Sequence, residues 1–231
     1  MAILTGNNST NSINGTSSSD LISGLGGDDK LDGKAGNDIL LGGDGNDWLR
    51  GGLGADVLYG GSGIDTAFYT HGVRDFSYNV LLGVLFIKDN VSSGNEGLDA
   101  LYDVEYIQFN SASGFAQDAT ALYHLVIGNN AANTLNGTAE KDLMLGFSLN
   151  DVFNMGRMDV AYGGAGADIF NLNLSMPSNL AASKLGYTFV DGQDGSDRLR
   201  LTINGSDAAG VAADIARFNA LSTTAKQAEF T

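Results

Sequence analysis

A nine-residue repeat constrains this chain more than any other feature of its sequence. Seven units follow one another without a gap from Gly6 to Phe68. Glycine occupies the first position in all seven units and the fourth position in the last five, and Ile or Leu occupies the eighth position in six. The sixth position holds, in order, Asn11, Asp20, Asp29, Asp38, Asp47, Asp56 and Asp65. Such a period predicts a stack of short, similar elements.

The residue types predict the shape of each unit. Glycine at the first and fourth positions would permit positive φ, so that six residues can form a tight loop. The other three residues form a short strand, whose middle aliphatic side chain points inward. A single unit cannot bury that side chain alone, but stacked units can. The sequence therefore predicts a parallel, two-sheeted solenoid with two units per coil, in which each unit stacks on the unit two places later.

Stacking would bring the sixth-position aspartates into two columns. One column holds Asp20, Asp38 and Asp56, and the other holds Asp29, Asp47 and Asp65. Strands stack about 4.8 Å apart, where two carboxylates repel by about 0.8 kcal/mol even in water. Ca²⁺ binds six to eight oxygens, including backbone carbonyls, and would reverse this repulsion. A flexible Gly/Asp linker is disfavoured, because it has no reason to keep an aliphatic residue at every ninth position.

The units resemble the calcium-binding nonapeptide of the RTX (repeats-in-toxin) family, GGxGxDxUx, where U is a large aliphatic residue. GGDGNDWLR and GGLGADVLY match it fully. The resemblance implies a right-handed parallel β-roll with about four Ca²⁺ ions, each held between two coils by sixth-position aspartates. The four implied pairs are Asp20 with Asp38, Asp38 with Asp56, Asp29 with Asp47, and Asp47 with Asp65. A fifth pair, Asn11 with Asp29, departs from the pattern in charge.

After Asp65 the nonapeptides are expected to end, and residues 69–126 are expected to form an antiparallel β cap. FSYNVLL and VLFIKD flank a glycine, which indicates a hairpin, and DALYDVEYIQF supplies a further strand. This segment resembles the one that often follows RTX repeats. Its aromatic residues indicate the small core of the cap, with a ligand-binding patch as the alternative; they are Phe68, Tyr69, Phe76, Tyr78, Phe86, Tyr102, Tyr106 and Phe109.

A weaker repeat begins at Gly128 and predicts a second, degenerate roll over residues 127–206 with fewer ions. One of its units, MGRMDVAY, has eight residues, and a last unit, GQDGSDRLR, stands apart at 192–200. The best candidate pairs for metal are Asp151 with Asp168 and Asp142 with Asp159, and a metal-free solenoid is the alternative. Residues 207–231 are expected to form a tail with a short amphipathic helix. Residues 1–68 then make the first roll, and the fold class is all-β.

Composition excludes several functions. The net charge of −15 disfavours nucleic acid and anionic membranes as partners. The absence of Cys excludes disulfides and thiolate chemistry. No apolar run approaches the length needed to span a bilayer, and no Sec-type signal peptide is visible. The sequence has no HExxH, GxSxG, Walker A or EF-hand motif, so a catalytic role is not expected.

Three functional hypotheses follow from these features. The first is a secreted or cell-surface calcium-binding protein that uses type I secretion, folds on Ca²⁺ outside the cell and serves in a surface layer, a matrix or adhesion, with self-association. The second is a non-catalytic module of a secreted lyase, epimerase, lipase or protease. The third is a module that binds cell-surface polysaccharide through aromatic residues.

Overall fold

The computed structural model describes residues 1–109, 121–156, 158–173, 188–202 and 227–229. Its internal contacts divide the chain into two units, Met1–Leu122 and Tyr123–Thr231. The described part is almost entirely β, and one 3-10 turn, η1 (Val73–Asp75), interrupts the strands. The described residues include no helix of the length and apolar character that a membrane span requires.

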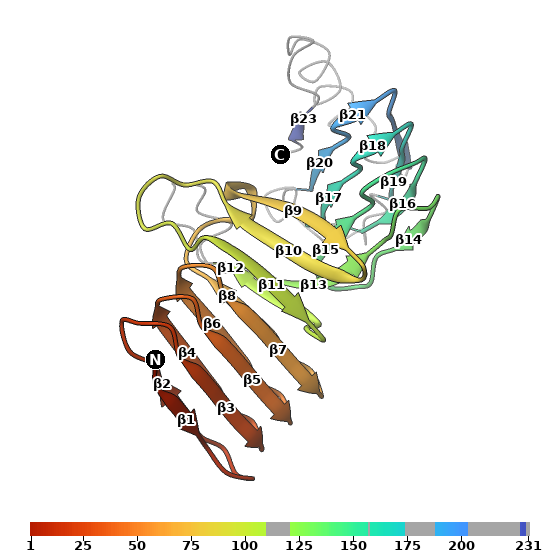
Figure 1. Cartoon of the computed structure of the whole chain (residues 1–231). Coiled ribbons are helices and arrows are strands. Elements are labelled where there is room, and N and C mark those ends of the chain that lie inside the picture. Colours follow the sequence, from red (N-terminus) through yellow and green to blue (C-terminus); the bar gives the residue numbers. More distant parts are fainter. Residues whose placement is uncertain (110–120, 157, 174–187, 203–226, 230–231) are drawn as a thin grey trace. The chain divides into compact units, whose positions relative to one another are not determined.

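The first unit is a two-sheeted parallel roll (Figure 1). One sheet has the order β1 (Ile3–Thr5), β3 (Leu21–Gly26), β5 (Ile39–Asp44), β7 (Val57–Ser62), β11 (Leu98–Tyr102), β10 (Val84–Asp89) and β9 (Phe76–Leu81). The other sheet includes β2 (Ser12–Asn14), β4 (Lys30–Ala35), β6 (Trp48–Leu53), β8 (Thr66–Tyr69) and β12 (Tyr106–Phe109). Ile22 pairs with Leu40 and Leu40 with Leu58, which confirms two units per coil.

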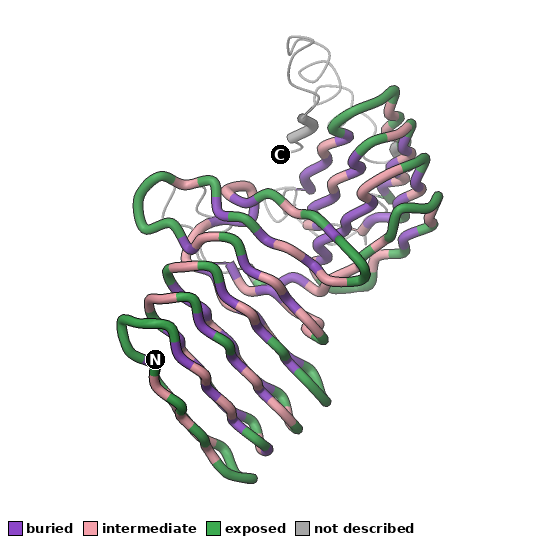
Figure 2. Tube along the Cα trace, in the orientation of Figure 1, coloured by how far each residue is buried: buried purple, intermediate pink, exposed green. Residues whose placement is uncertain are grey.

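The core of this roll is built from the eighth-position side chains, as the repeat predicts. Ile22, Leu31, Leu40 and Leu49 are fully buried, and Leu58 is 1% exposed. Burial alternates along the first residues of β3, β4, β5 and β6 (Figure 2), because successive side chains point to opposite faces. The inward face thus carries one aliphatic side chain per unit, and it is covered only when neighbouring units stack on it.

The glycines act differently from the prediction. In the five units from Gly24 to Phe68, positive φ values occur at the second and fourth positions, as at Leu25 (79°) and Gly27 (89°), and not at the first. A Cβ on the first-position Gly24 would lie 2.0 Å from Asp29 Oδ2 and 2.7 Å from the carbonyl oxygen of Gly42. The first glycine is therefore required for close approach of the carboxylate and the next coil, and the expectation of positive φ at that position was wrong.

Residues 69–109 form both a hairpin and a further coil. Strands β9 and β10 pair antiparallel, as expected for the cap. Strands β11 and β12, however, pair parallel with β7 and β8 and so continue the roll. Tyr69, Phe76 and Phe109 are at most 4% exposed and contact one another, so these three aromatic residues form a core.

The second unit is a smaller parallel roll. Its described strands are β13 (Ala121–Ile127), β14 (Thr134–Asn136), β15 (Asp142–Leu145), β16 (Val152–Met155), β17 (Val160–Tyr162), β18 (Ala165–Gly166), β19 (Ile169–Asn173), β20 (Phe189–Asp191), β21 (Asp194–Gly195), β22 (Arg198–Thr202) and β23 (Gln227–Glu229). Strands β13, β15, β17 and β20 pair in parallel, as do β14, β16, β19 and β22, whereas β23 pairs antiparallel with β20.

The second roll tolerates its short unit by changing the register. Leu135 pairs with Phe153, an offset of 18 residues, whereas Phe153 pairs with Phe170, an offset of 17. Phe153 and Phe170 stack with their ring centroids 4.6 Å apart, so two aromatic side chains join aliphatic ones in the core of this roll. The helix predicted within residues 207–220 lies outside the described residues.

Candidate calcium sites

A ladder of hydrogen bonds joins the sixth-position aspartates of successive coils. One carboxylate oxygen of each aspartate accepts the backbone N–H of the aspartate one coil earlier. The bonds run from Asp20 N to Asp38 Oδ1 (2.7 Å), Asp38 N to Asp56 Oδ1 (2.7 Å), Asp29 N to Asp47 Oδ1 (2.8 Å) and Asp47 N to Asp65 Oδ1 (2.8 Å). The structure therefore brings together all four pairs that the sequence predicts in the first roll.

The second oxygen of most of these carboxylates is buried without a hydrogen-bond donor. This holds for Oδ2 of Asp29, Asp38, Asp47, Asp56, Asp65, Asp151 and Asp168. A buried carboxylate oxygen with no donor is costly unless a cation compensates it. The seven oxygens thus fit a hard, oxygen-binding divalent cation such as Ca²⁺.

The loops around these oxygens stack too closely to admit side chains. A Cβ on Gly43 would lie 2.2 Å from the carbonyl oxygen of Leu25, and one on Gly45 would lie 2.5 Å from that of Gly27. Backbone carbonyl oxygens of one loop therefore lie against the next loop, beside the aspartate column. Carbonyls and carboxylates together form the donor set that Ca²⁺ prefers.

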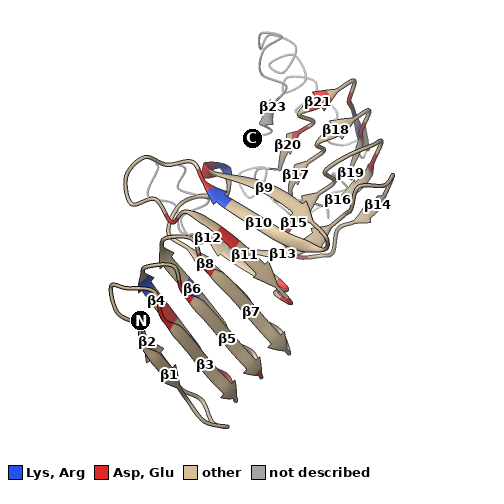
Figure 3. Cartoon of the chain, viewed as in Figure 1, with Lys and Arg blue, Asp and Glu red and all other residues tan. Residues whose placement is uncertain are grey.

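Burial and like charge shift the pKa of the columns upward. Burial raises the pKa of Asp56 and of Asp65 to about 6, and the charges of Asp38 and Asp47 add to these shifts. In the second roll, burial raises the pKa of Asp151 to about 6 and that of Asp159 to about 7. Acidic residues, red in Figure 3, outnumber basic ones, blue, among the described residues. A bound cation would compensate the buried negative charge that raises these pKa values.

Comparison with known proteins agrees with this geometry. The family model of the RTX calcium-binding nonapeptide repeat matches residues 5–40, 32–67 and 159–174. The chain carries RTX calcium-binding repeats. The two longer matches cover the stacked glycine loops, and the third covers the loop that presents Asp168.

A solved structure similar to this chain is the extracellular lipase LipA from Serratia marcescens. The two share 18% sequence identity with a TM-score of 0.27, over 82% of this chain and 32% of the lipase chain. The chain thus corresponds to about a third of the length of that protein. No curated protein matches the sequence.

The RTX ladder extends beyond the residues that the sequence predicts. Asp56 N donates to Asp99 Oδ1 (2.9 Å) and Asp65 N to Glu105 Oε2 (2.8 Å). Asp99 is the sixth residue of GNEGLDALY, residues 94–102. This is a nonapeptide separated from the others by the hairpin, so the expectation that the repeats end after Asp65 was wrong. Burial raises the pKa of Asp99 to about 8, as it raises that of Asp56 beside it in the ladder.

The earliest RTX loops satisfy their own acceptors. Both the backbone N and Oγ1 of Thr16 donate to Asp20 Oδ2, at 2.7 and 2.8 Å. Asn7 N donates to Asn11 Oδ1 at 2.7 Å, and Asn11 N donates to Asp29 Oδ1 at 2.6 Å. Asp20 and Asn11 therefore stand in the predicted columns, but their loops are closed by hydrogen bonds within the protein.

The second RTX roll contains the same two kinds of loop, one with and one without a protein donor to Oδ2. Asp142 N donates to Asp159 Oδ1 (3.0 Å) and Asp151 N to Asp168 Oδ1 (2.8 Å), so both predicted pairs are adjacent. Thr138 closes the loop of Asp142, since its N donates to Asp142 Oδ2 at 2.6 Å. Gly156 N donates to Asp159 Oδ2 at 2.7 Å. The pair Asp151 and Asp168, each with a buried Oδ2 that lacks a donor, is thus the better candidate for an ion.

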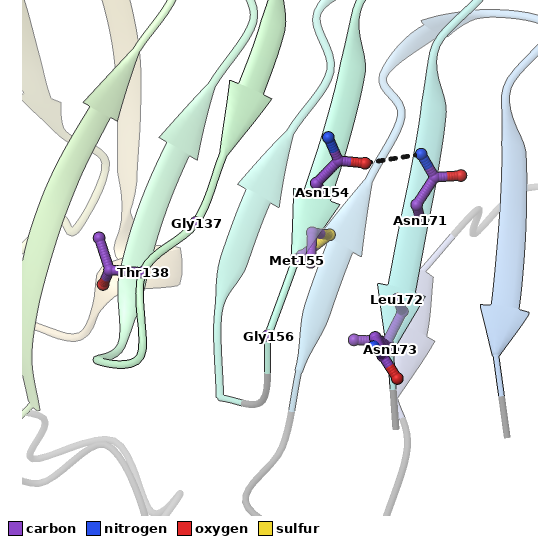
Figure 4. Close-up of a pocket in the computed structure, with 8 residues that line it drawn as sticks. All are labelled: Gly137, Thr138, Asn154, Met155, Gly156, Asn171, Leu172 and Asn173. Carbon is purple, nitrogen blue, oxygen red and sulfur yellow. Dashed lines mark hydrogen bonds between the residues drawn. The ribbon is translucent and has the colours of Figure 1, made fainter. Parts of the chain in front are cut away.

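A groove of about 520 Å³ lies on the second roll (Figure 4). It is lined by Gly137, Thr138, Asn154, Met155, Gly156, Asn171, Leu172 and Asn173. The amide of Asn171 donates to Asn154 Oδ1 (2.9 Å), and that of Asn154 donates to Asn136 Oδ1 (2.7 Å). These hydrogen bonds between asparagine side chains connect successive coils. The residues that line the groove include no acidic or basic side chain.

Proposed function

We propose that this protein is a non-enzymatic, extracellular calcium-binding protein whose RTX rolls complete their folding when Ca²⁺ binds. The observation that carries the proposal is the set of seven buried Oδ2 atoms without a donor. These oxygens and the stacked loop carbonyls would serve as ligands of the bound ions. Folding and metal binding are then coupled, because the columns of carboxylates oppose compaction until they are neutralised.

This coupling suits a protein that leaves the cell unfolded. RTX repeats are typical of type I secreted extracellular proteins, and the extracellular modules among calcium-binding proteins bind at about 10⁻⁴–10⁻³ M. With such an affinity the chain stays loose inside the cell and folds in the millimolar calcium outside. Delivery by type I secretion is part of the proposal.

The test is far-UV circular dichroism during a calcium titration of protein treated with EDTA. We expect a cooperative gain of β signal with Ca²⁺ and none with equimolar Mg²⁺, which prefers a rigid octahedral site and keeps its waters. A metal-free protein that already has the full β signal, and does not respond to Ca²⁺, would contradict the proposal.

For the biological role we favour a surface layer, a matrix or adhesion. The outer face of the first sheet supports this choice, because it exposes apolar side chains along successive strands. Ile39 is 40% exposed on β5, and Tyr59, which is 37% exposed on β7, stacks on Tyr102 of β11. An exposed apolar face of this kind is typical of interaction surfaces. Sedimentation velocity with and without Ca²⁺ would reveal calcium-dependent self-association.

A second candidate, polysaccharide binding, is favoured by the opposite outer face. Trp48 and Phe68 stack there with ring centroids 4.9 Å apart, and Lys30 Nζ lies 4.3 Å from the centroid of the Trp48 ring. Stacked aromatic rings beside a cation suit the apolar faces and the acidic groups of surface sugars. On a glycan array we expect wild type to bind a surface polysaccharide and Trp48→Ala to bind it more weakly. No binding by wild type, or equal binding by both, would contradict this candidate function.

A further inference from the structure

Two acids and a histidine converge beside the last coil of the first roll, outside the calcium columns. Asp89 is the last residue of β10, His71 follows β8, and Glu96 precedes β11. One ligand atom from each of the three lies within 4.8 Å of the other two. His71 Nδ1 is 3.0 Å from Asp89 Oδ2 and 3.7 Å from Glu96 Oε2.

The backbone holds both carboxylates in place. Val91 N donates to Asp89 Oδ1 and Glu96 N donates to Asp89 Oδ2, both at 2.8 Å. Thr70 N donates to Glu96 Oε2 at 2.9 Å. These bonds leave the three side chains aimed at one another from three different segments, and this preorganisation favours a ligand that all three can share.

Charge favours a dication between them. The side chains of Asp89 and Glu96 are 0% and 3% exposed, and that of His71 is 19% exposed. A protonated imidazole offsets only one of the two buried negative charges, whereas a dication with a neutral imidazole offsets both. Burial raises the pKa of Glu96, which agrees with a carboxylate whose charge is poorly compensated.

We propose that His71, Asp89 and Glu96 form a binding site for a transition-metal dication of the zinc class. An imidazole nitrogen with two carboxylate oxygens suits Zn²⁺, Mn²⁺ or Fe²⁺ better than Ca²⁺, which takes six to eight oxygens. The partial exposure of His71 leaves access for the ion and for a water in the fourth position. The bound ion would fasten the hairpin to the last coil of the roll.

The test is a zinc titration by calorimetry in saturating Ca²⁺, so that the calcium columns are filled. We expect wild type to bind one Zn²⁺ that His71→Gln binds at least about a hundredfold more weakly, because loss of a ligand costs more than the 10–100-fold typical of a ligand's hydrogen-bond partner. His124→Gln is the matched control, since His124 also contacts a buried carboxylate, Asp142, at 3.0 Å. Equal zinc binding by wild type and His71→Gln, or no binding by wild type, would overturn the proposal.

Two further measurements keep the test independent of the calcium sites. Calcium-induced circular dichroism of His71→Gln must match that of wild type, and if this variant does not fold, Glu96→Gln replaces it. X-ray absorption of zinc-loaded wild type should show one imidazole among oxygen ligands, and a spectrum of oxygen alone would overturn the assignment. If wild type folds on Ca²⁺ but binds no Zn²⁺, only the zinc proposal is wrong. If it binds Zn²⁺ but its β signal does not respond to Ca²⁺, only the proposed function is wrong.

Discussion

The loops of Asp20 and Asp142, near the start of each roll, and the glycine loops that follow differ in what satisfies the carboxylate at their sixth position. In both, a carboxylate at the sixth position turns into its own loop. At Asp20 and Asp142, the N–H and hydroxyl of Thr16 and Thr138 donate to that carboxylate. In the loops of Asp29 and Asp47 no protein donor reaches Oδ2.

The backbone explains the difference. In the glycine loops the second residue has a positive φ, as at Leu25 (79°), Gly43 (116°) and Phe147 (76°). Thr16 and Thr138 lie outside this region, and their N–H groups donate to the carboxylate. We infer that a cation takes the place of the threonine donors, so the two kinds of loop differ in the backbone conformation of their second and fourth residues.

The largest effect is expected where one carboxylate serves two candidate sites. Asp47 lies between Asp29 and Asp65 in its column, so Asp47→Asn removes a charged ligand from both pairs. The calcium midpoint in circular dichroism should rise by about tenfold or more, because ligand charge sets affinity over orders of magnitude. Asp20→Asn is the comparison, and its shift should be clearly smaller, because Thr16 already satisfies Asp20. Equal shifts would show that the two kinds of loop are alike.

Acidification should stabilise the metal-free fold and weaken calcium binding. Asp56, Asp65 and Asp99 have pKa values in the folded state of about 6, 6 and 8, above the ordinary value of 3.8. Their protonation therefore stabilises the metal-free fold below about pH 4, and this stabilisation is lost as the pH rises through 6 to 8. The β signal in EDTA should grow on acidification from pH 8 to pH 5, while the calcium midpoint should rise. A metal-free signal that falls over this range would refute the role of the columns.

Loss of a threonine hydroxyl should weaken the self-closed loops without affecting metal binding. Thr16→Val removes the bond from Oγ1 to Asp20 Oδ2 but keeps the shape of the side chain. We expect a loss of about 1 kcal/mol in the free energy of unfolding, measured by urea denaturation in saturating Ca²⁺. Thr138→Val should behave alike. A shift of the calcium midpoint would instead indicate that these loops bind an ion.

The smallest effect should come from relief of strain in a glycine loop. Lys34 has a φ of 74°, a conformation that costs a non-glycine residue about 1–2 kcal/mol. Lys34→Gly removes this cost but adds freedom to the unfolded chain, about 0.5–1 kcal/mol. The melting temperature in saturating Ca²⁺ should rise by a few degrees at most, and Lys30→Gly, at a residue of the same strand without a positive φ, should lower it.

Most of the fold was predictable from the repeat because its period fixes which side chains meet. The coil register, the inward column from Ile22 to Leu58 and the aspartate pairs all follow from a spacing of nine. The coil of Asp99 was missed because an inserted hairpin separates it from the other units, although GNEGLDALY keeps Gly, Gly, Asp and Leu at the first, fourth, sixth and eighth positions. Glu105 was missed because its loop lacks the nine-residue spacing. The role of the first glycine depends on how closely the coils approach, which no single unit reveals.

The hydrogen-bond ladder runs in one direction, from the backbone N–H of one coil to a side chain of the next. The first and the last coil of a roll therefore need different groups. Each amide donates to an acid in the following coil, so a coil at the start needs to bring only an N–H, as Ala2 and Asn11 do. A coil at the finish must bring an acceptor, as Asp99 and Glu105 do. Every residue but proline carries an N–H, while few carry a carboxylate. Only the first coil of such a roll can therefore carry almost any residue at this position, whereas every coil after it must bring an acceptor.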